Sequence, residues 1–141
     1  AFRFLVKPFE KEDLYEALDS VIKNLAKTAY IVVKDTVNQK NITIPKNEII
    51  YAQADNIYAE VVTAQGIFLY SNKISLLVKK LNEEYFYRSN RSYIVNFNYI
   101  IGYSKKEIEF SNGQKALISS SKFKDFKSKY LNYLKRKSIG E

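Results

Sequence analysis

The segment of residues 86–101, with the sequence FYRSNRSYIVNFNYII, constrains this chain most. It is dense in aromatic and β-branched residues, which favour strands and supply a core. Two arginines, Arg88 and Arg91, and several asparagines interrupt it, and Asn90 and Arg91 lie in its short polar break. Arg and Asn are the side chains that bind purine edges through paired hydrogen bonds in a DNA groove. We therefore expect the segment to anchor itself in a core and to present polar side chains outward.

Short stretches with strand-like composition alternate with polar turns through most of the chain. We expect strands at residues 30–34, 42–44, 49–53, 57–63, 67–70, 86–88, 101–104, 107–110 and 114–118. The dipeptides Asp55-Asn56 and Asn112-Gly113 are turn signals, and Asn-Gly is the strongest short hairpin signal in the chain. Residues 93–101 fit either a strand or a short helical turn.

Two segments have the apolar periodicity of a helix. Apolar residues recur at i, i+3, i+4 and i+7 in residues 74–81, and Ser71 and Asn72 are placed to cap this short helix. Residues 119–121 are three serines that precede a second segment of helical spacing, residues 123–134. Many short strands, a short helix and a C-terminal helix together predict a mainly β fold.

The composition argues against an enzyme. The chain has no cysteine and no histidine, so it has no disulfide framework, no thiolate metal site and none of the commonest general base. We therefore expect no cofactor and no metal. No apolar run approaches the roughly 18 residues that span a membrane, and the N-terminus has no cleavable signal pattern. The sequence thus predicts a cytoplasmic protein without membrane contact.

The positive charge is unevenly distributed. The chain has a formal net charge of +8, but residues 1–29 contain five basic and five acidic residues and are neutral. Residues 30–141 hold the remaining 18 basic and 10 acidic residues, and therefore the whole excess. A neutral leader joined to a basic body indicates two origins, and it predicts a polyanion as the partner of the second part.

A family resemblance connects these features. The run F-x-R-S-N-R-S-Y-I-V-N, preceded by S-L-L-V-K-K-L and followed by N-G-Q and a Ser-Lys helix start, resembles the LytTR family of bacterial DNA-binding domains. The resemblance extends over about residues 30–137. It implies an output domain of a two-component response regulator, with a mostly β fold that binds duplex DNA through loops. It also implies repeated promoter sites bound as a homodimer, and a role in transcription regulation.

The leader resembles a different domain. Residues 2–6 read as a buried strand, Lys7 and Pro8 follow, and residues 10–27 have helical spacing. This order is similar to the last strand and helix of a response-regulator receiver, in which the lysine equivalent to Lys7 contacts a phosphorylated aspartate. That aspartate is absent here, so a sensor histidine kinase would act only through the missing part of the receiver. We expect residues 1–28 to be a receiver remnant with a linker, and residues 29–141 to be the DNA-binding domain.

The resemblance also suggests which residues contact bases. In LytTR domains the loop equivalent to Asn90 and Arg91 enters the major groove. Many members have His where this chain has Asn90, which can also donate and accept hydrogen bonds. Asn56 lies in the segment that resembles the family's first DNA-contacting loop. We therefore expect Asn56, Asn90 and Arg91 to contact base edges in the major groove.

Positively charged residues are expected to contact the DNA backbone. Residues 122–137 contain seven basic residues and one acidic residue, a net charge of +6. They begin where the family places a Ser-Arg contact, a position that Ser121 or Lys122 occupies here. A phosphate needs a positive charge rather than a guanidinium fork, so lysine is sufficient. The predicted backbone contacts are Lys73, Arg88, Ser121, Lys122 and Lys124.

Other interpretations remain open. Arg91 could lie in an exposed turn and pair with a nearby glutamate, and the Asn56 side chain could bond only its own backbone. The twelve tyrosines could stack on single-stranded nucleic acid, although most of them, such as Tyr30 and Tyr51, fall at positions that favour a core or half-buried role. The basic C-terminal helix could instead bind an acidic protein or a membrane surface.

Overall fold

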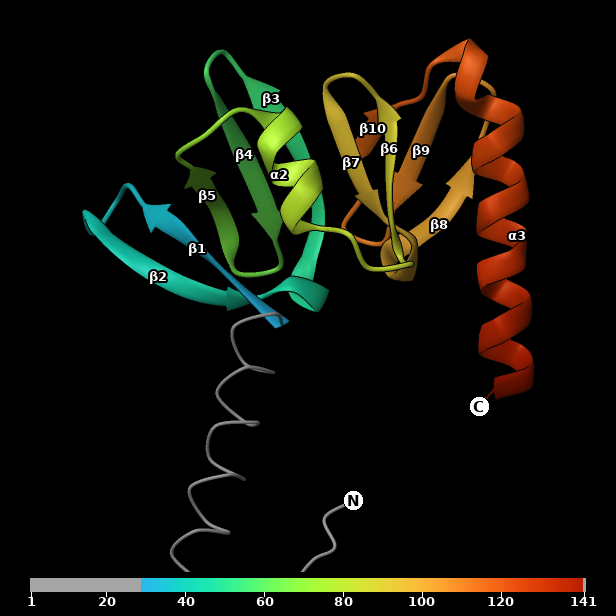
Figure 1. Ribbon diagram of the computed structural model, residues 1–141, viewed down its shortest axis with the longest axis horizontal. Coiled ribbons are helices and arrows are strands. Elements are labelled where there is room, and N and C mark those ends of the chain that lie inside the picture. The colour runs from blue at the N-terminus through green and yellow to red at the C-terminus, as the bar shows by residue number, and fades with distance from the viewer. Residues whose placement is uncertain (1–28, 141) are drawn as a thin grey trace, which may run out of the picture.

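The computed structural model describes residues 29–140 of the chain (Figure 1). The expected receiver remnant, with its strand at residues 2–6 and its helix at residues 10–27, lies outside the described residues. Within the described part, no helix is long and apolar enough to cross a membrane.

Seven strands form the larger sheet, in which every neighbouring pair is antiparallel. They are β1 (Tyr30–Asp35), β2 (Lys40–Pro45), β3 (Ile49–Asp55), β4 (Tyr58–Thr63), β5 (Gly66–Tyr70), β6 (Phe86–Asn90) and β7 (Tyr93–Asn96). Their spatial order is β2-β1-β5-β4-β3-β7-β6. β1 pairs with β2 along its whole length, but it pairs with β5 only at Lys34 and Leu69. The first part of β1 therefore diverges from β5.

The smaller sheet has three antiparallel strands, and two α-helices complete the described fold. The strands are β8 (Ile100–Tyr103), β9 (Glu107–Phe110) and β10 (Lys115–Leu117), in the order β10-β9-β8. The α-helices are α2 (Ile74–Lys80) and α3 (Phe123–Gly140), and the 3-10 helices are η1 (Lys46–Glu48), η2 (Phe97–Tyr99) and η3 (Ser120–Lys122). Figure 1 shows α2 against the larger sheet and α3 alongside the smaller one.

The mainly β fold class is confirmed, and a strand occurs at each place where the sequence predicted one. Residues 93–101 contain both expected alternatives, because β7 is followed by η2 and then by β8. The buried Asn96 causes this break. Its Nδ2 donates to the carbonyl of Ile49 at 2.7 Å, and its Oδ1 accepts from the N–H of Asn98 at 2.8 Å. One side chain thus ties the end of β7 to β3 and caps η2.

The predicted capping of α2 by Ser71 and Asn72 is wrong. The N-cap residue is Lys73, and its side chain makes no capping hydrogen bond. The predicted apolar face is correct, because Ile74 and Leu77 are buried. A seven-residue helix is too short to be stable alone, so packing of this face on the sheet stabilises α2.

The interior divides into two apolar clusters. The first includes Val61 of the larger sheet and Leu77 of α2. The second includes Phe110 of the smaller sheet and Phe126 of α3, both fully buried. In this second cluster Tyr51 of β3 stacks on Phe110, with ring centroids 5.0 Å apart. Because the second cluster contains residues of both sheets and of α3, it fixes these three elements relative to one another.

Candidate nucleic-acid interface

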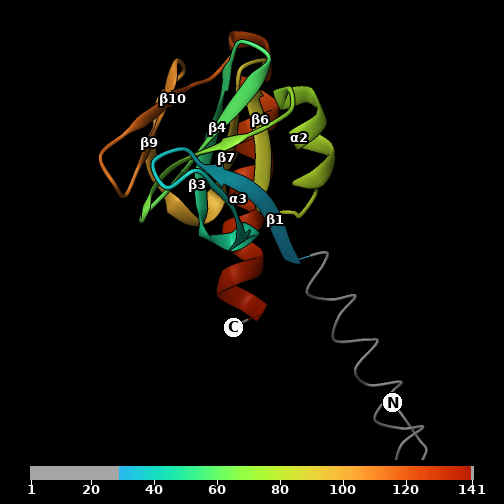
Figure 2. The same cartoon turned by 90° about the vertical axis from the view of Figure 1, so that its left-hand side faces the viewer.

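Two turns and the start of α3 lie at the same end of the molecule. β3 and β6 both pair antiparallel with β7, so they run in the same direction and their last residues lie at the same end of the sheet. The segment before α3 is bonded to β6 at this end. The N–H of Ser119 donates to the carbonyl of Ser89 at 2.8 Å, and Ser89 Oγ donates to the carbonyl of Leu117 at 2.8 Å. Both views show these segments along the upper edge (Figure 1, Figure 2). We call this region, made up of residues 55–58, 90–93 and 119–124, the loop end.

The β6–β7 turn presents Arg91 at its tip. Asn90 Oδ1 accepts a hydrogen bond from the N–H of Ser92 at 2.9 Å, which closes the turn locally. Asn90 is half-buried, whereas Arg91 is exposed. No carboxylate in the described part of the chain pairs with Arg91. The ion pair considered as an alternative is therefore absent among these residues, and the guanidinium is available to a ligand.

Arg88 supports this turn from within. Its Nη2 donates to the carbonyl of Arg91 at 2.7 Å, while its Nε is buried and has no hydrogen-bond partner among the described residues. Arg88 was predicted to contact the DNA backbone, and that contact stays a prediction. The structure adds a second role, because a guanidinium that holds the Arg91 carbonyl restricts the conformation of the turn.

The start of α3 is attached to the same strand. Lys122 is half-buried, and its ammonium donates to the carbonyl of Arg88 at 3.1 Å and lies 5.9 Å from the centroid of the Tyr87 ring. By contrast, Ser121 and Lys124 are exposed. Of these three predicted contacts, Ser121 and Lys124 face solvent, and Lys122 is already engaged with the protein.

The single acidic residue in this basic segment is occupied by internal contacts. The hydroxyl of Tyr87 donates to Asp125 Oδ2 at 2.8 Å, and Lys129 pairs with the same oxygen at 3.6 Å. Burial and the contact with Asp125 raise the pKa of Tyr87 well above its usual range, so the phenol remains a donor even at a pH where an ordinary tyrosine ionises. Asp125 is therefore engaged by Tyr87 and Lys129, and it makes no ion pair with the neighbouring Lys124.

The β3–β4 turn presents Asn56, which has a backbone φ of 63°. Asparagine tolerates this left-handed conformation better than most residues, which explains its place in a two-residue turn. Asn56 is exposed, and its side chain makes no hydrogen bond to a described residue. The alternative of an Asx turn is therefore not found, and the amide is available. Its neighbours Ile57 and Tyr58 are also exposed, at 58% and 39%.

The structure brings three further lysines close to the loop end. The predicted contact Lys73 is exposed and follows β5, whose last residue, Tyr70, pairs with Ala59 beside the β3–β4 turn. Lys105 and Lys106, exposed in the β8–β9 turn, were not predicted. The carbonyl of Lys106 accepts from the N–H of Ile118 at 2.9 Å, which places this turn beside the start of α3. Successive antiparallel strands alternate in direction, and this alternation was the sequence signal that could have placed Lys105 and Lys106 at this end of the molecule.

Comparison with known families identifies the class of domain. Residues 39–131 match the sequence profile of the LytTr DNA-binding domain. This match covers most of the chain, which therefore belongs to the LytTR family, and the predicted resemblance is confirmed. The family is one of DNA-binding rather than catalytic domains. No curated protein matches the sequence.

A solved structure has the same fold. It is described as the LytTr DNA-binding domain of a methyl-accepting/DNA response regulator from Bacillus cereus. The two chains are 22% identical, with a TM-score of 0.58, and the similarity covers 80% of this chain and 98% of that one. At this level of identity the likeness concerns the fold, and it supports the LytTR-type arrangement of the two sheets.

Proposed function

We propose that this chain binds duplex DNA in a sequence-dependent way through its loop end, as the output domain of a response-regulator transcription factor. The observation that carries the proposal is the convergence of Asn56, Arg91 and Lys124 on one end of the molecule from three separate segments. All three side chains are exposed, and none forms an ion pair or hydrogen bond with a described residue. Membership of a DNA-binding family supports the same conclusion.

Base recognition is assigned to the two turns. Arg91 carries a planar guanidinium on a supported turn, a geometry suited to the paired acceptors O6 and N7 of a guanine. Asn56 has a free amide that can donate and accept, as the edge of an adenine requires. In Asn90 the Oδ1 atom already accepts from Ser92, so its Nδ2 group is the part that would donate to a base.

Contact with the phosphates is assigned to the lysines around these turns. Lys73, Lys105, Lys106 and Lys124 are exposed residues of segments next to the two turns, and Ser121 is exposed as well. If about five phosphates are neutralised, the logarithm of the binding constant should fall with the logarithm of salt concentration with a slope of roughly −4 to −5. A salt-insensitive affinity would contradict this assignment.

The proposal is tested by selecting binding sites from a pool of random duplexes with the 141-residue chain. We expect a short consensus to emerge, with an affinity at physiological salt roughly a thousandfold or more above that for random duplex. Recovery of unrelated sequences with equal affinities would overturn sequence recognition. Tighter binding of single-stranded than of duplex oligonucleotides would overturn the duplex assignment.

The regulatory setting is part of the proposal. We assign residues 1–28 to the end of a receiver domain and residues 29–141 to the output domain, in a cytoplasmic phosphorelay protein that binds promoter repeats as a homodimer. Residues 28–141 alone should then bind the selected site as tightly as the whole chain. If removing residues 1–27 unfolds the remainder in a thermal melt, the domain boundary is wrong.

A single-stranded nucleic-acid site is less well supported, because the tyrosines of residues 29–140 do not form one stacking surface. Tyr51 and Tyr130 are buried. The exposed tyrosines Tyr30, Tyr58 and Tyr103 belong to β1, β4 and β8, which are not neighbours in either sheet. Tyr30 was expected to be buried or half-buried, but it is 41% exposed because it lies where β1 diverges from β5.

A further inference from the structure

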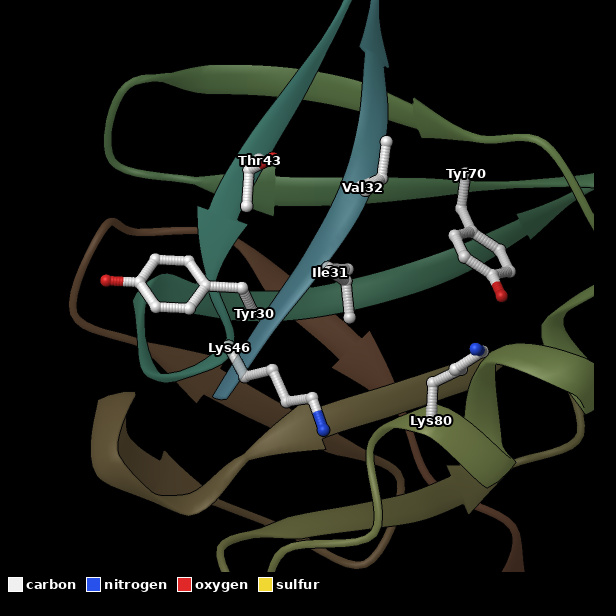
Figure 3. A pocket seen from close by; sticks show the side chains of 7 residues that line it. All are labelled: Tyr30, Ile31, Val32, Thr43, Lys46, Tyr70 and Lys80. Atoms are coloured by element: carbon white, nitrogen blue, oxygen red, sulfur yellow. The ribbon is translucent and has the colours of Figure 1, made fainter. Parts of the chain in front are cut away.

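A second site lies away from the loop end, in the space left where β1 diverges from β5. The cavity there has a volume of about 700 Å³, within the usual range of about 300–1,000 Å³ for small-ligand pockets. It is lined by Tyr30, Ile31, Val32, Thr43, Lys46, Tyr70 and Lys80 (Figure 3). None of these residues belongs to the loop end, so the cavity is separate from the proposed DNA contacts.

The cavity exists because of the pairing of β1. This strand is bonded to β2 through all six of its residues, but it meets β5 only at Lys34 and Leu69. Its first residues therefore project past the end of β5, and the space beneath them is not filled by a neighbouring strand. Ile31 forms the buried apolar wall, while Val32 is 58% exposed at the rim.

Two polar groups meet at one side of this apolar space. In Figure 3 the hydroxyl of Tyr70 and the ammonium of Lys80 point toward one another, whereas the ammonium of Lys46 lies apart from this pair. Tyr70 is 8% exposed, and Lys80 lies at the exposed mouth. An ammonium and a phenol both donate hydrogen bonds, and together they favour an anion.

The charges near the cavity are not balanced. Lys46 Nζ pairs with Glu83 Oε2 at 3.1 Å, so the charge of Lys46 is largely compensated and the Glu83 carboxylate disfavours an anion beside it. No carboxylate in the described part of the chain pairs with Lys80. The net attraction for an anion therefore comes from Lys80, while Tyr70 supplies a donor on the buried side.

We propose that this cavity binds a small amphiphilic organic acid, with its acid group between Lys80 and Tyr70 and its apolar body against Ile31. The apolar wall explains why a bare inorganic anion is a poor ligand, because it would leave this wall in contact with water. The charge of Lys80 explains why a neutral alcohol of the same shape is also poorer, because its hydroxyl can accept a hydrogen bond but carries no negative charge to pair with the ammonium.

The test uses octanoate as the probe and the 141-residue chain labelled with ¹⁵N. We expect saturable amide shifts at Ile31, Val32, Tyr70 and Lys80, with octanoate binding at least fivefold more tightly than octanol. No saturable shift, or equal binding of octanol, would overturn the proposal. Shifts of the same amides when the protein alone is diluted would show that a second copy of the chain fills the cavity, which would also overturn it.

Two variants assign the acid group to its donors. Lys80→Gln should weaken octanoate binding about five- to tenfold, because it removes a charge-assisted hydrogen bond. Tyr70→Phe keeps the ring and should weaken binding about threefold. Lys79→Gln is the matched control, because Lys79 is an exposed lysine of the same helix that does not line the cavity. Equal octanoate affinities for Lys80→Gln and Lys79→Gln would contradict the proposed position of the acid group.

Discussion

The β6–β7 and β3–β4 turns lie at the same end of the molecule, but the contacts that hold them differ. Within the first, Arg88 Nη2 donates to the carbonyl of Arg91 at 2.7 Å, and Lys122 Nζ in turn donates to the carbonyl of Arg88 at 3.1 Å. The first turn is also joined to β3, because the N–H of Ala54 donates to the carbonyl of Ser92 at 2.8 Å. At the tip of the second turn, the Asn56 side chain makes no hydrogen bond with a described residue.

If both turns contact DNA as proposed, this difference predicts two modes of contact. A turn whose backbone is fixed before binding can place a guanidinium fork on one base edge without a further ordering cost. A turn that lacks such support can adapt to the groove, but it gives weaker discrimination. We therefore infer that the β6–β7 turn determines most of the sequence preference and that the β3–β4 turn refines it.

The largest expected effect comes from removing the packing that supports the first turn. Phe126 is fully buried, and its ring lies 5.8 Å from that of Tyr87 and 6.1 Å from that of Phe97. Phe126→Ala should lower the free energy of unfolding by about 3–5 kcal/mol, measured by urea denaturation. Lys127→Ala, an exposed control on the same helix, should change it by less than about 0.5 kcal/mol. A loss below about 1 kcal/mol for Phe126→Ala would show that α3 does not support the turn.

The next largest effect is on DNA affinity, and two substitutions distinguish base recognition from phosphate contact. Arg91→Ala should cost about 1–3 kcal/mol on the selected DNA site and much less on random duplex, because it removes a base contact. Lys124→Ala should weaken binding to both DNAs by similar factors and reduce the salt slope by about one. Both residues are exposed, so the fold should be retained. Equal losses of binding free energy on both DNAs for Arg91→Ala would show that the β6–β7 turn contacts phosphates rather than bases.

A smaller effect is expected when the hydrogen bond from Arg88 to the β6–β7 turn is removed. Arg88→Met should lower the free energy of unfolding by about 1 kcal/mol, because the carbonyl of Arg91 loses a charge-assisted donor. It should also speed hydrogen exchange of the backbone amides in the β6–β7 turn. Binding to the selected site should weaken more than binding to random duplex. Arg136→Met is a matched control, because Arg136 is exposed and its ion pair within residues 29–140 is with the exposed Glu84 at 3.5 Å. A uniform loss on both DNAs would instead support a direct phosphate contact by Arg88.

The smallest effect concerns the β3–β4 turn. Asn56→Gly keeps the positive φ without strain, so the free energy of unfolding should change by less than about 0.5 kcal/mol. Specific binding should weaken by no more than about 1 kcal/mol, because only one adaptable contact is lost. Filter binding on the selected site and on random duplex provides the measurement. A loss larger than that for Arg91→Ala would reverse the proposed ranking of the two turns.

Much of the fold could be predicted because local pattern and burial agree. The apolar spacing of Ile74 and Leu77 predicted their buried face, and Asn112-Gly113 predicted the β9–β10 hairpin. The capping residues of α2 could not be predicted in the same way. Ser71 and Asn72 are common caps, but packing of the helix on the sheet selected Lys73 instead.

The candidate site was less accessible to sequence reasoning, because its contacts join distant segments. The residue type of Lys122 indicated a phosphate contact, but its ammonium lies against the carbonyl of Arg88, 34 residues earlier. The role of Arg88 within its own turn likewise depends on the backbone conformation at Arg91. Lys105 and Lys106 were missed because their position beside α3 depends on how the smaller sheet packs.

Amide chemical-shift mapping with the selected duplex is the most direct test of whether duplex DNA binds to the loop end. We expect large shifts at residues 55–58, 90–93 and 119–124, with little change in the β4–β5 and β9–β10 turns at the opposite ends of their strands. Large shifts confined to those opposite turns, or to the exposed middle of α3 with the loop end unaffected, would contradict it.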